Sequence, residues 1–465
     1  MLTEKMNPEK QYIDLYAECR SLIAEHSAPL LNAPREQAFA DFCRLGLPTR
    51  KMERYRYTDV PAAFAPDYGL NLRNLDIPVN PHEVFRCDVP NLSTSLYFVV
   101  NDRFCDKALP KAGLPDGVKV MSLAEAAVKH PDLVAPRYGK LARTDKDGLN
   151  ALNTMLAQDG LFIHVSRGVA MERPIQVINI LRADVNLMVN RRVLVVVEEG
   201  AEAKLLFCDH AIDDRDFLTT QVGEVFVGEG ARLELYELEE THVRNRRFSN
   251  LYVDLQRGSA ATVDSITLHN CLTRNRTDVT LSGAGAEVNM YGCVIADKQQ
   301  HVDNNTLIDH HVPDCRSTEL YKYVLDGEAV GAFAGRVLVR EDAQRTVSHE
   351  TNANLCATKT ARMYTQPMLE IYADDVKCSH GSTVGQLNEQ ALFYMRQRGI
   401  PEDEARMLLK FAFAGEVLES IGLTPLRDRL HYLVEKRFRG ELSKCEGCRL
   451  CKYVNRRNGN EAGHK

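Results

Sequence analysis

The chain lacks three features that would each indicate a large functional class: a long hydrophobic run, an excess of positive charge and an N-terminal signal core. Its densest apolar stretch, Val193 to Val197, has the length of a strand, far below the ~20 residues of a membrane-spanning helix. The net charge of −6 argues against general nucleic-acid binding, because neutralising phosphates requires clustered lysines and arginines. The N-terminal sequence MLTEKMNPEKQ has no hydrophobic core. We therefore expect a soluble cytoplasmic protein that neither inserts into membranes nor binds nucleic acid.

Common catalytic motifs are absent as well. The chain has no G-x-x-x-x-G-K-[ST] loop, so it does not hydrolyse ATP by that route, and neither G-x-S-x-G nor H-E-x-x-H occurs. The chain has thirteen cysteines, an odd number scattered without secretory features, which does not predict a disulfide framework. Most are expected to be small buried side chains, including Cys208, Cys271 and Cys293.

From Gly160 to Asp375 short β-branched runs follow one another, separated by a recurrent small turn. The turns contain glycines that lie 27 to 32 residues apart, at Gly168, Gly200, Gly230, Gly258 and Gly285. A nearly constant period of several strands without helices is typical of a solenoid, in which each coil packs on the next. A β-sandwich is the alternative, but it would show a less regular period and more Asn-Gly or Asp-Gly hairpin turns. We predict a mainly β fold with a β-helix core over residues 149–380.

Helical patterns flank this core on both sides. In the N-terminal region, residues 1–148, Ser122 and Glu125 form a capping box before a predicted helix. Residues 381–440 predict three helices with apolar stripes, over 389–398, from Pro401 to about Gly422, and over 426–438. These stripes serve either internal packing or the docking of a partner. Residues 441–465 form a basic, cysteine-rich tail.

Cys378 and His380 lie two residues apart where the β-rich region meets the helical one. Alternate side chains of an extended strand point to the same face, so a sulfur and an imidazole nitrogen can lie side by side here. Such a pair suits iron, zinc or an iron–sulfur cluster. The alternative is a buried cysteine beside a histidine that satisfies a turn. Asp374 and Asp375 precede the pair on the same predicted strand, and we interpret them as edge or capping groups.

Two other polar stretches deserve comparison as metal sites. Residues 301–315 contain three histidines and a cysteine, but His310 and His311 would face opposite sides of a strand. We expect these histidines to pack and hydrogen-bond between coils. The stretch 349–354 is similarly polar, and its asparagines are expected to form side-chain ladders at coil turns.

The tail contains the pattern C-x-x-C-x-x-C at Cys445, Cys448 and Cys451, the first three cysteines of a ferredoxin-type loop. The fourth cysteine and its following proline are missing. Basic neighbours favour the thiolate form and hence metal binding. Our hypothesis is a labile cluster or a zinc ion, completed by His464 or another subunit. The alternative is a flexible tail with three exposed thiols.

Two long stretches resemble the SufB/SufD family, the scaffold proteins of the SUF machinery for iron–sulfur cluster assembly. The C-terminal stretch comprises 367–385, PMLEIYADDVKCSHGSTVG, and 393–400, FYMRQRGI. The N-terminal stretch, 46–58, matches the family pattern except that Tyr55 stands where tryptophan is common. The resemblance covers roughly the whole chain. Residues 378–381 favour the SufD branch over its paralogue SufB, which carries the main cluster and persulfide cysteines.

The resemblance implies a right-handed parallel β-helix and a non-catalytic scaffold subunit in a SufB–SufC–SufD complex. It implies that His380, with Cys378 beside it, helps to form a site for a transient iron–sulfur cluster at the SufB interface. It also implies that residues 381–440 dock the ABC-type ATPase SufC. Sulfur would come from a cysteine desulfurase system, and reduced FAD would be an electron source for the complex. Without SufB the chain would be a candidate homodimer.

Two rival functions come from other classes. A β-helix carbohydrate-active protein would need paired carboxylates in a surface groove. An electron carrier would need a complete set of cluster ligands, which the tail does not supply.

Overall fold

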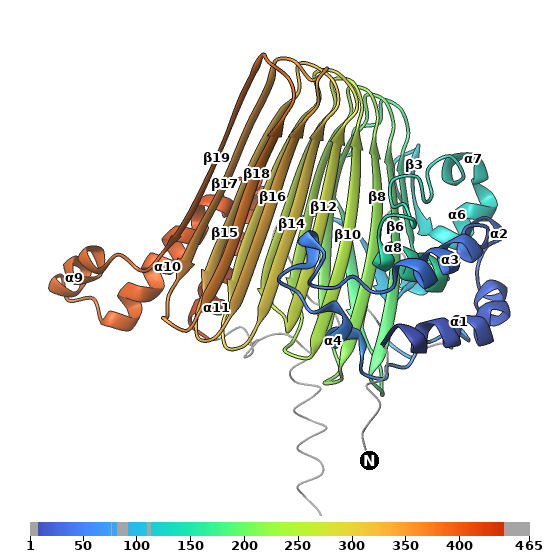
Figure 1. Ribbon diagram of the computed structural model, residues 1–465, viewed down its shortest axis with the longest axis horizontal. Coiled ribbons are helices and arrows are strands. Elements are labelled where there is room, and N and C mark those ends of the chain that lie inside the picture. The colour runs from blue at the N-terminus through green and yellow to red at the C-terminus, as the bar shows by residue number, and fades with distance from the viewer. Residues whose placement is uncertain (1–7, 76, 81–91, 109–112, 441–465) are drawn as a thin grey trace, which may run out of the picture.

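The computed structural model describes residues 8–75, 77–80, 92–108 and 113–440. Two sheets face each other and form a parallel β-helix, with helices near both ends (Figure 1). This confirms the predicted mainly β fold with helical flanks, whereas the right-handed sense of the coil stays a prediction. No helix in these residues is long and apolar enough to cross a membrane.

From β4 onwards the chain alternates between the two sheets, and successive strands within a sheet run parallel. Sheet A comprises β3 (Val118–Ser122), β4 (Leu161–Val165), β6 (Leu187–Val197), β8 (Phe217–Val227), β10 (Asn245–Leu255), β12 (Leu272–Leu281), β14 (His301–His310), β16 (Val330–Val339) and β18 (Arg362–Ile371). Sheet B comprises β2 (Arg103–Phe104), β1 (Ser95–Val100), β5 (Ile175–Leu181), β7 (Glu202–Ala211), β9 (Arg232–Glu240), β11 (Ala260–His269), β13 (Glu287–Ala296), β15 (Arg316–Leu325), β17 (Thr346–Cys356) and β19 (Val376–Gly385). The strands β18 and β19 therefore form the last coil.

Glycines set the period of the coil, as the sequence predicts. Gly200, Gly230 and Gly258 have φ angles of +65°, +65° and +63°, a left-handed conformation that side chains with a Cβ adopt only with strain. Each of these glycines donates its N–H to a carbonyl of the next coil's turn: Gly200 to Glu229, and Gly230 to Arg257. The turns therefore stack in register, and so do the strands between them.

The interior between the sheets is largely apolar. Valine, leucine and isoleucine side chains from both sheets form one continuous buried cluster along the coil. A second apolar cluster lies on the outer face of sheet B, where the C-terminal helices cover it. Burial of this area is the main source of stability. Cys208 and Cys293 are buried as predicted, whereas Cys271 lies just before β12 and is only half-buried; all nine described cysteines are free thiols.

The helices before the coil pack around its first turns. They are α1 (Pro8–Glu25), α2 (Pro29–Asn32), α3 (Arg35–Leu45), α4 (Val60–Phe64), α6 (Leu123–Lys129), α7 (Pro131–Val134) and α8 (Gly148–Leu156), with short 3-10 turns η1 (Glu53–Tyr55) and η2 (Asp106–Ala108). The predicted cap of α6 is confirmed, because the Ser122 hydroxyl accepts a hydrogen bond from the Glu125 N–H.

The N-terminal stretch 46–58 is held on the outer face of sheet A by charged and aromatic contacts. The Tyr55 hydroxyl donates to Asp147, which also caps α8 and forms an ion pair with Arg276 at 2.8 Å. The Arg274 guanidinium lies over the Tyr55 ring, 3.9 Å from its centre. The stretch thus joins the N-terminal helices to the middle of the coil.

Three helices follow the coil: α9 (Glu389–Gln397), α10 (Glu402–Leu418) and α11 (Thr424–Phe438). The first projects beyond the last coil, and α10 packs against sheet B (Figure 1). Near the end of α11, Arg437 forms two 2.8 Å contacts with Asp297 and donates to the Leu268 carbonyl. The three predicted helices are therefore present, and two of them are fixed to the coil.

Candidate functional site

Cys378 and His380 lie on β19, the edge strand of sheet B in the last coil. Alternation along this strand places both side chains on the face directed towards the interior of the coil, while Ser379 between them faces outward and contacts His349 at 2.8 Å. No further coil covers this end in the described part of the chain. The strand thus presents sulfur and nitrogen together at an open end.

The two side chains differ in burial. His380 is exposed, whereas Cys378 is half-buried and packs against a small apolar cluster that includes Val339 and Ala373. Burial raises the pKa of the Cys378 thiol, and a hydrogen bond from the Ser348 backbone partly opposes this rise. Both groups are therefore reachable from outside, the imidazole more freely than the thiol.

Polar side chains lie directly beneath this pair in the two preceding coils. The register pairs Cys378 with Ser348 and Ser317, and the Ser317 hydroxyl donates to Ser348 at 2.8 Å. It pairs His380 with Glu350 and then with Glu319. Neighbouring strands lie about 4.8 Å apart, so each of these side chains stacks on the next. Hydroxyls thus lie under the thiol and carboxyls under the imidazole.

Both carboxyls are deeply buried, and neither forms an ion pair with a lysine, arginine or histidine among the residues that the structure describes. Glu350 is 1% exposed, and neither of its carboxyl oxygens has a hydrogen-bond partner among the described residues. Burial and the neighbouring carboxyl raise the pKa of Glu350 to about 9. Burial likewise raises the pKa of Glu319 to about 7, although the Thr306 hydroxyl lowers it. At neutral pH Glu350 is therefore uncharged.

Sequence reasoning missed these two carboxyls as part of the site. Glu319, Glu350 and His380 are separated by 31 and 30 residues, within the period of the turn glycines. Counting one coil back from His380 would have identified Glu350. The signal is masked in the sequence because the polar stretch 349–354 fits a coil turn as well as a strand.

The structure differs from the sequence predictions for two polar stretches near this end of the coil. The stretch 349–354 lies within β17, so the prediction that its asparagines form ladders at turns is wrong. Asn354 donates to Asn352 on the same strand at 2.6 Å, and both pair with tyrosines in the preceding coil. Asp374 and Asp375 lie in the turn before β19, so they do not share its strand. The polypeptide turns there before the edge strand begins.

The histidines of 301–315 are held by hydrogen bonds, as expected. The His310 Nε2 lies 3.0 Å from the Ser317 hydroxyl, and the His311 Nε2 lies 2.9 Å from an Asp309 oxygen. Nowhere in the described ranges do three histidine, cysteine, aspartate or glutamate side chains gather closely enough to hold a metal ion. Cys445, Cys448 and Cys451 lie outside those ranges.

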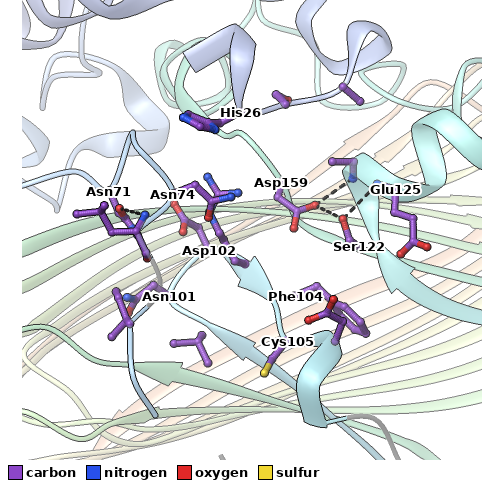
Figure 2. Close-up of a pocket in the computed structure, with 18 of the residues that line it drawn as sticks. His26, Asn71, Asn74, Asn101, Asp102, Phe104, Cys105, Ser122, Glu125 and Asp159 are labelled. Atoms are coloured by element: carbon purple, nitrogen blue, oxygen red, sulfur yellow. Dashed lines mark hydrogen bonds between the residues drawn. The ribbon is translucent and has the colours of Figure 1, made fainter. Parts of the chain in front are cut away.

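A separate cavity of about 830 Å³ opens at the other end of the coil, next to β1 and β2 (Figure 2). Asp102, Glu125 and Asp159 line it, and burial raises the pKa of Asp102 and Asp159. Asp159 accepts hydrogen bonds from the Ser122 hydroxyl and the Ala124 N–H, so it stabilises the start of α6. The cavity shares no residue with the pair on β19.

The arrangement on β19 provides at most part of a metal site. Thiolate and imidazole are good ligands for iron, but two ligands alone leave most coordination positions open. An exposed edge strand offers unpaired N–H and C=O groups to a second chain. The geometry therefore favours a site that is completed by another subunit.

Comparisons with known proteins match almost the whole chain. Residues 180–413 match the family described as SUF system FeS cluster assembly, SufBD core domain, and residues 6–177 match the SufBD protein N-terminal region. An iron–sulfur cluster assembly SufBD family protein of Synechocystis is 27% identical over 94% of this chain and 98% of its own length. The iron–sulfur cluster assembly protein SufD of Escherichia coli is 27% identical over 87% and 92%, and that of Bacillus subtilis 23% over 75% and 80%.

Replacing Glu350 with glutamine is expected to stabilise the protein at high pH. The folded state keeps the Glu350 proton up to about pH 9, whereas the unfolded state ionises near pH 4.5, so the unaltered protein loses stability as pH rises between these values. Glutamine cannot ionise, so Glu350→Gln should add about 1 to 3 kcal/mol at pH 9 and little at pH 4.5. Urea unfolding at pH 5, 7 and 9 measures the difference.

The exposed Glu341→Gln variant is the control and should differ from the unaltered protein by less than about 0.5 kcal/mol throughout. A gain from Glu350→Gln that does not grow with pH would contradict the buried, protonated state of Glu350.

Proposed function

Because the chain belongs to the SufBD family of SUF-system iron–sulfur cluster assembly proteins, we propose that it is the SufD-type scaffold subunit of a complex with SufB and the ATPase SufC. Relatives named SufD match it over most of their length. The sequence Cys378-Ser379-His380-Gly381 supports the same assignment. In this role the chain holds and positions its cargo and has no catalytic turnover of its own.

The observation that carries the proposal is the accessible sulfur–nitrogen pair on the edge strand of an open coil. The nascent iron–sulfur cluster is the cargo, and Cys378 and His380 are the groups of this chain that hold it. SufB supplies the remaining ligands. Binding by either subunit alone is weak because each has only part of the ligand set, so separating the subunits releases the cluster.

The surface around this end suits a protein partner. The strand β19 is ten residues long, and one of its edges pairs with no other strand of the described residues; a strand of SufB adds there by backbone hydrogen bonds. Large apolar side chains are exposed on the last coil and at its turn, namely Tyr364, Ile371, Tyr372 and Val384. Without SufB the same surface supports pairing of two copies of this chain.

The helix α9 is the proposed docking site for SufC. Phe393 and Tyr394 are 62% and 58% exposed on this helix, which projects from the coil (Figure 1). Adjacent exposed aromatic side chains are typical anchors of protein–protein interfaces. Because α10 and α11 are fixed to the outer face of sheet B, movement of SufC would be transmitted to the coil.

Sulfur reaches the assembled complex from a cysteine desulfurase, and the complex works in the cytoplasm. Reduced FAD is an electron source for the complex only if another subunit provides the site. Five carboxyl groups line the cavity beside β1 against two cationic side chains, Arg103 and Lys107, and this excess of acidic groups does not suit the two phosphates of FAD.

The tail provides a second, independent metal-binding proposal. Cys445, Cys448 and Cys451 supply three thiolates, which suit zinc or a labile iron–sulfur cluster. His464 or another subunit provides the fourth ligand.

Replacing His380 with alanine is expected to lower the yield of cluster on the SufB–SufC–SufD complex at least fivefold. The side chain is exposed, so the fold and the assembly of the three subunits should be unchanged. The measurement is the visible absorbance of the complex after anaerobic reconstitution with iron and sulfide. The control is His349→Ala, an exposed histidine on the outer face of the neighbouring strand. Equal yields from both variants would remove His380 from the site.

The double substitution Phe393→Ala and Tyr394→Ala is expected to abolish co-purification with SufC while leaving SufB bound. Both side chains are more than half exposed, so their loss should not change the thermal stability of the chain. Tyr432→Ala, which removes an exposed aromatic group from α11, is the control and should retain SufC. Retention of SufC by the double variant would move the docking site elsewhere.

A chain that ends at Gly440 is expected to lose about one metal site per molecule, measured as iron or zinc content after anaerobic reconstitution. The truncation keeps Arg437 and its contacts with Asp297, so α11 should stay in place. A full-length chain with serine at 445, 448 and 451 separates the loss of thiols from the loss of the tail. Unchanged metal content in both would leave the tail without this role.

A further inference from the structure

The buried carboxyl of Glu350 is not needed to build the coil. The same position is apolar in the five coils of sheet B that precede Glu319, where it is occupied in order by Ile175, Leu205, Leu235, Val263 and Met290. An apolar residue there would pack without leaving buried carboxyl oxygens unpaired, which is costly. Apart from Ser95 of β1, which pairs with Ile175 at the opposite end of sheet B, the polar residues of this row lie in the last three coils, at Glu319, Glu350 and His380. The row changes its chemistry as it approaches the open end.

The opposite sheet leaves room for this carboxyl. Gly335 of β16 faces it, and a Cβ atom at that position would lie 2.0 Å from the Glu350 Oε1. Any residue other than glycine would therefore displace the Glu350 side chain. The space is matched to a carboxyl group that has no partner among the described residues.

We infer that Glu350 is a second ligand of this chain for the ferrous ion handled at His380, so that one oxygen and one nitrogen ligand come from adjacent coils. The inference rests on the proposed function and extends its site inward by one coil. Carboxylate oxygen and imidazole nitrogen are both suitable ligands for Fe(II), and binding of the cation releases to solvent the proton that Glu350 otherwise holds at neutral pH. Glu319 lies one coil deeper and is separated from His380 by Glu350. It is therefore not a ligand and affects the bound ion only through its charge.

Binding of Mn(II) to the full-length chain tests the inference without requiring cluster formation. Mn(II) prefers oxygen and nitrogen ligands over thiolates, so the tail cysteines should contribute little. The concentration of free Mn(II), followed by its electron paramagnetic resonance signal, gives the affinity. Glu350→Gln and His380→Ala should each weaken binding at least tenfold. Glu319→Gln makes the same chemical change one coil deeper and should alter the affinity less than twofold.

A Glu350→Gln variant with unchanged affinity would overturn the inference, as would an unaltered chain that binds no Mn(II) at millimolar concentration. Equal loss of Mn(II) affinity in Glu350→Gln and Glu319→Gln would also overturn it, because the removal of a nearby charge would then explain both losses without a ligand role for Glu350. These failures are separable from failure of the proposed function. If His380→Ala lowers the cluster yield of the complex while Glu350→Gln leaves Mn(II) binding intact, the scaffold role stands without Glu350.

Discussion

The in-register stacking of parallel coils is the constraint on which the rest of this structure depends. Each turn glycine donates its N–H to the turn of the next coil, and this fixes one strand directly over another. As a result, a residue's nearest neighbours across the sheet are about one coil period away in sequence. The interior is therefore organised as rows, and a row can change from apolar to polar without disturbing the backbone.

This constraint explains how a chain of ordinary composition concentrates chemistry at one end. The row that contains Ile175 and Met290 closes the coil by hydrophobic contact. In the two coils after Met290 the same row contains the buried carboxyls of Glu319 and Glu350, and in the third it contains His380. Natural proteins commonly break their own packing rules where function requires it. The unpaired carboxyls in the last coils are such a departure.

The regular part of the fold was predictable from sequence because its signals are local. The spacing of Gly168, Gly200 and Gly230 revealed the coil period, and the Ser122–Glu125 capping box located α6. Cys378 and His380 were recognised because two residues on one strand share a face. The Arg274 contact over Tyr55 was not predictable, because it joins segments more than 200 residues apart and depends on the path of the N-terminal loop.

The part of the site beneath His380 was missed for a related reason. Glu350 is unremarkable beside His349 and acquires its character only from the residues one coil away, including the missing side chain at Gly335. The turn before β19 was also misjudged, because the polar residues Asp374 and Asp375 fit an edge strand as well as a turn.

The uncovered edge of β19 has a consequence for how such a chain selects a partner. Backbone groups along a free strand pair with whichever strand reaches them first. Backbone pairing at such an edge supplies affinity but little selectivity, so the choice of partner falls to the side chains that flank the strand.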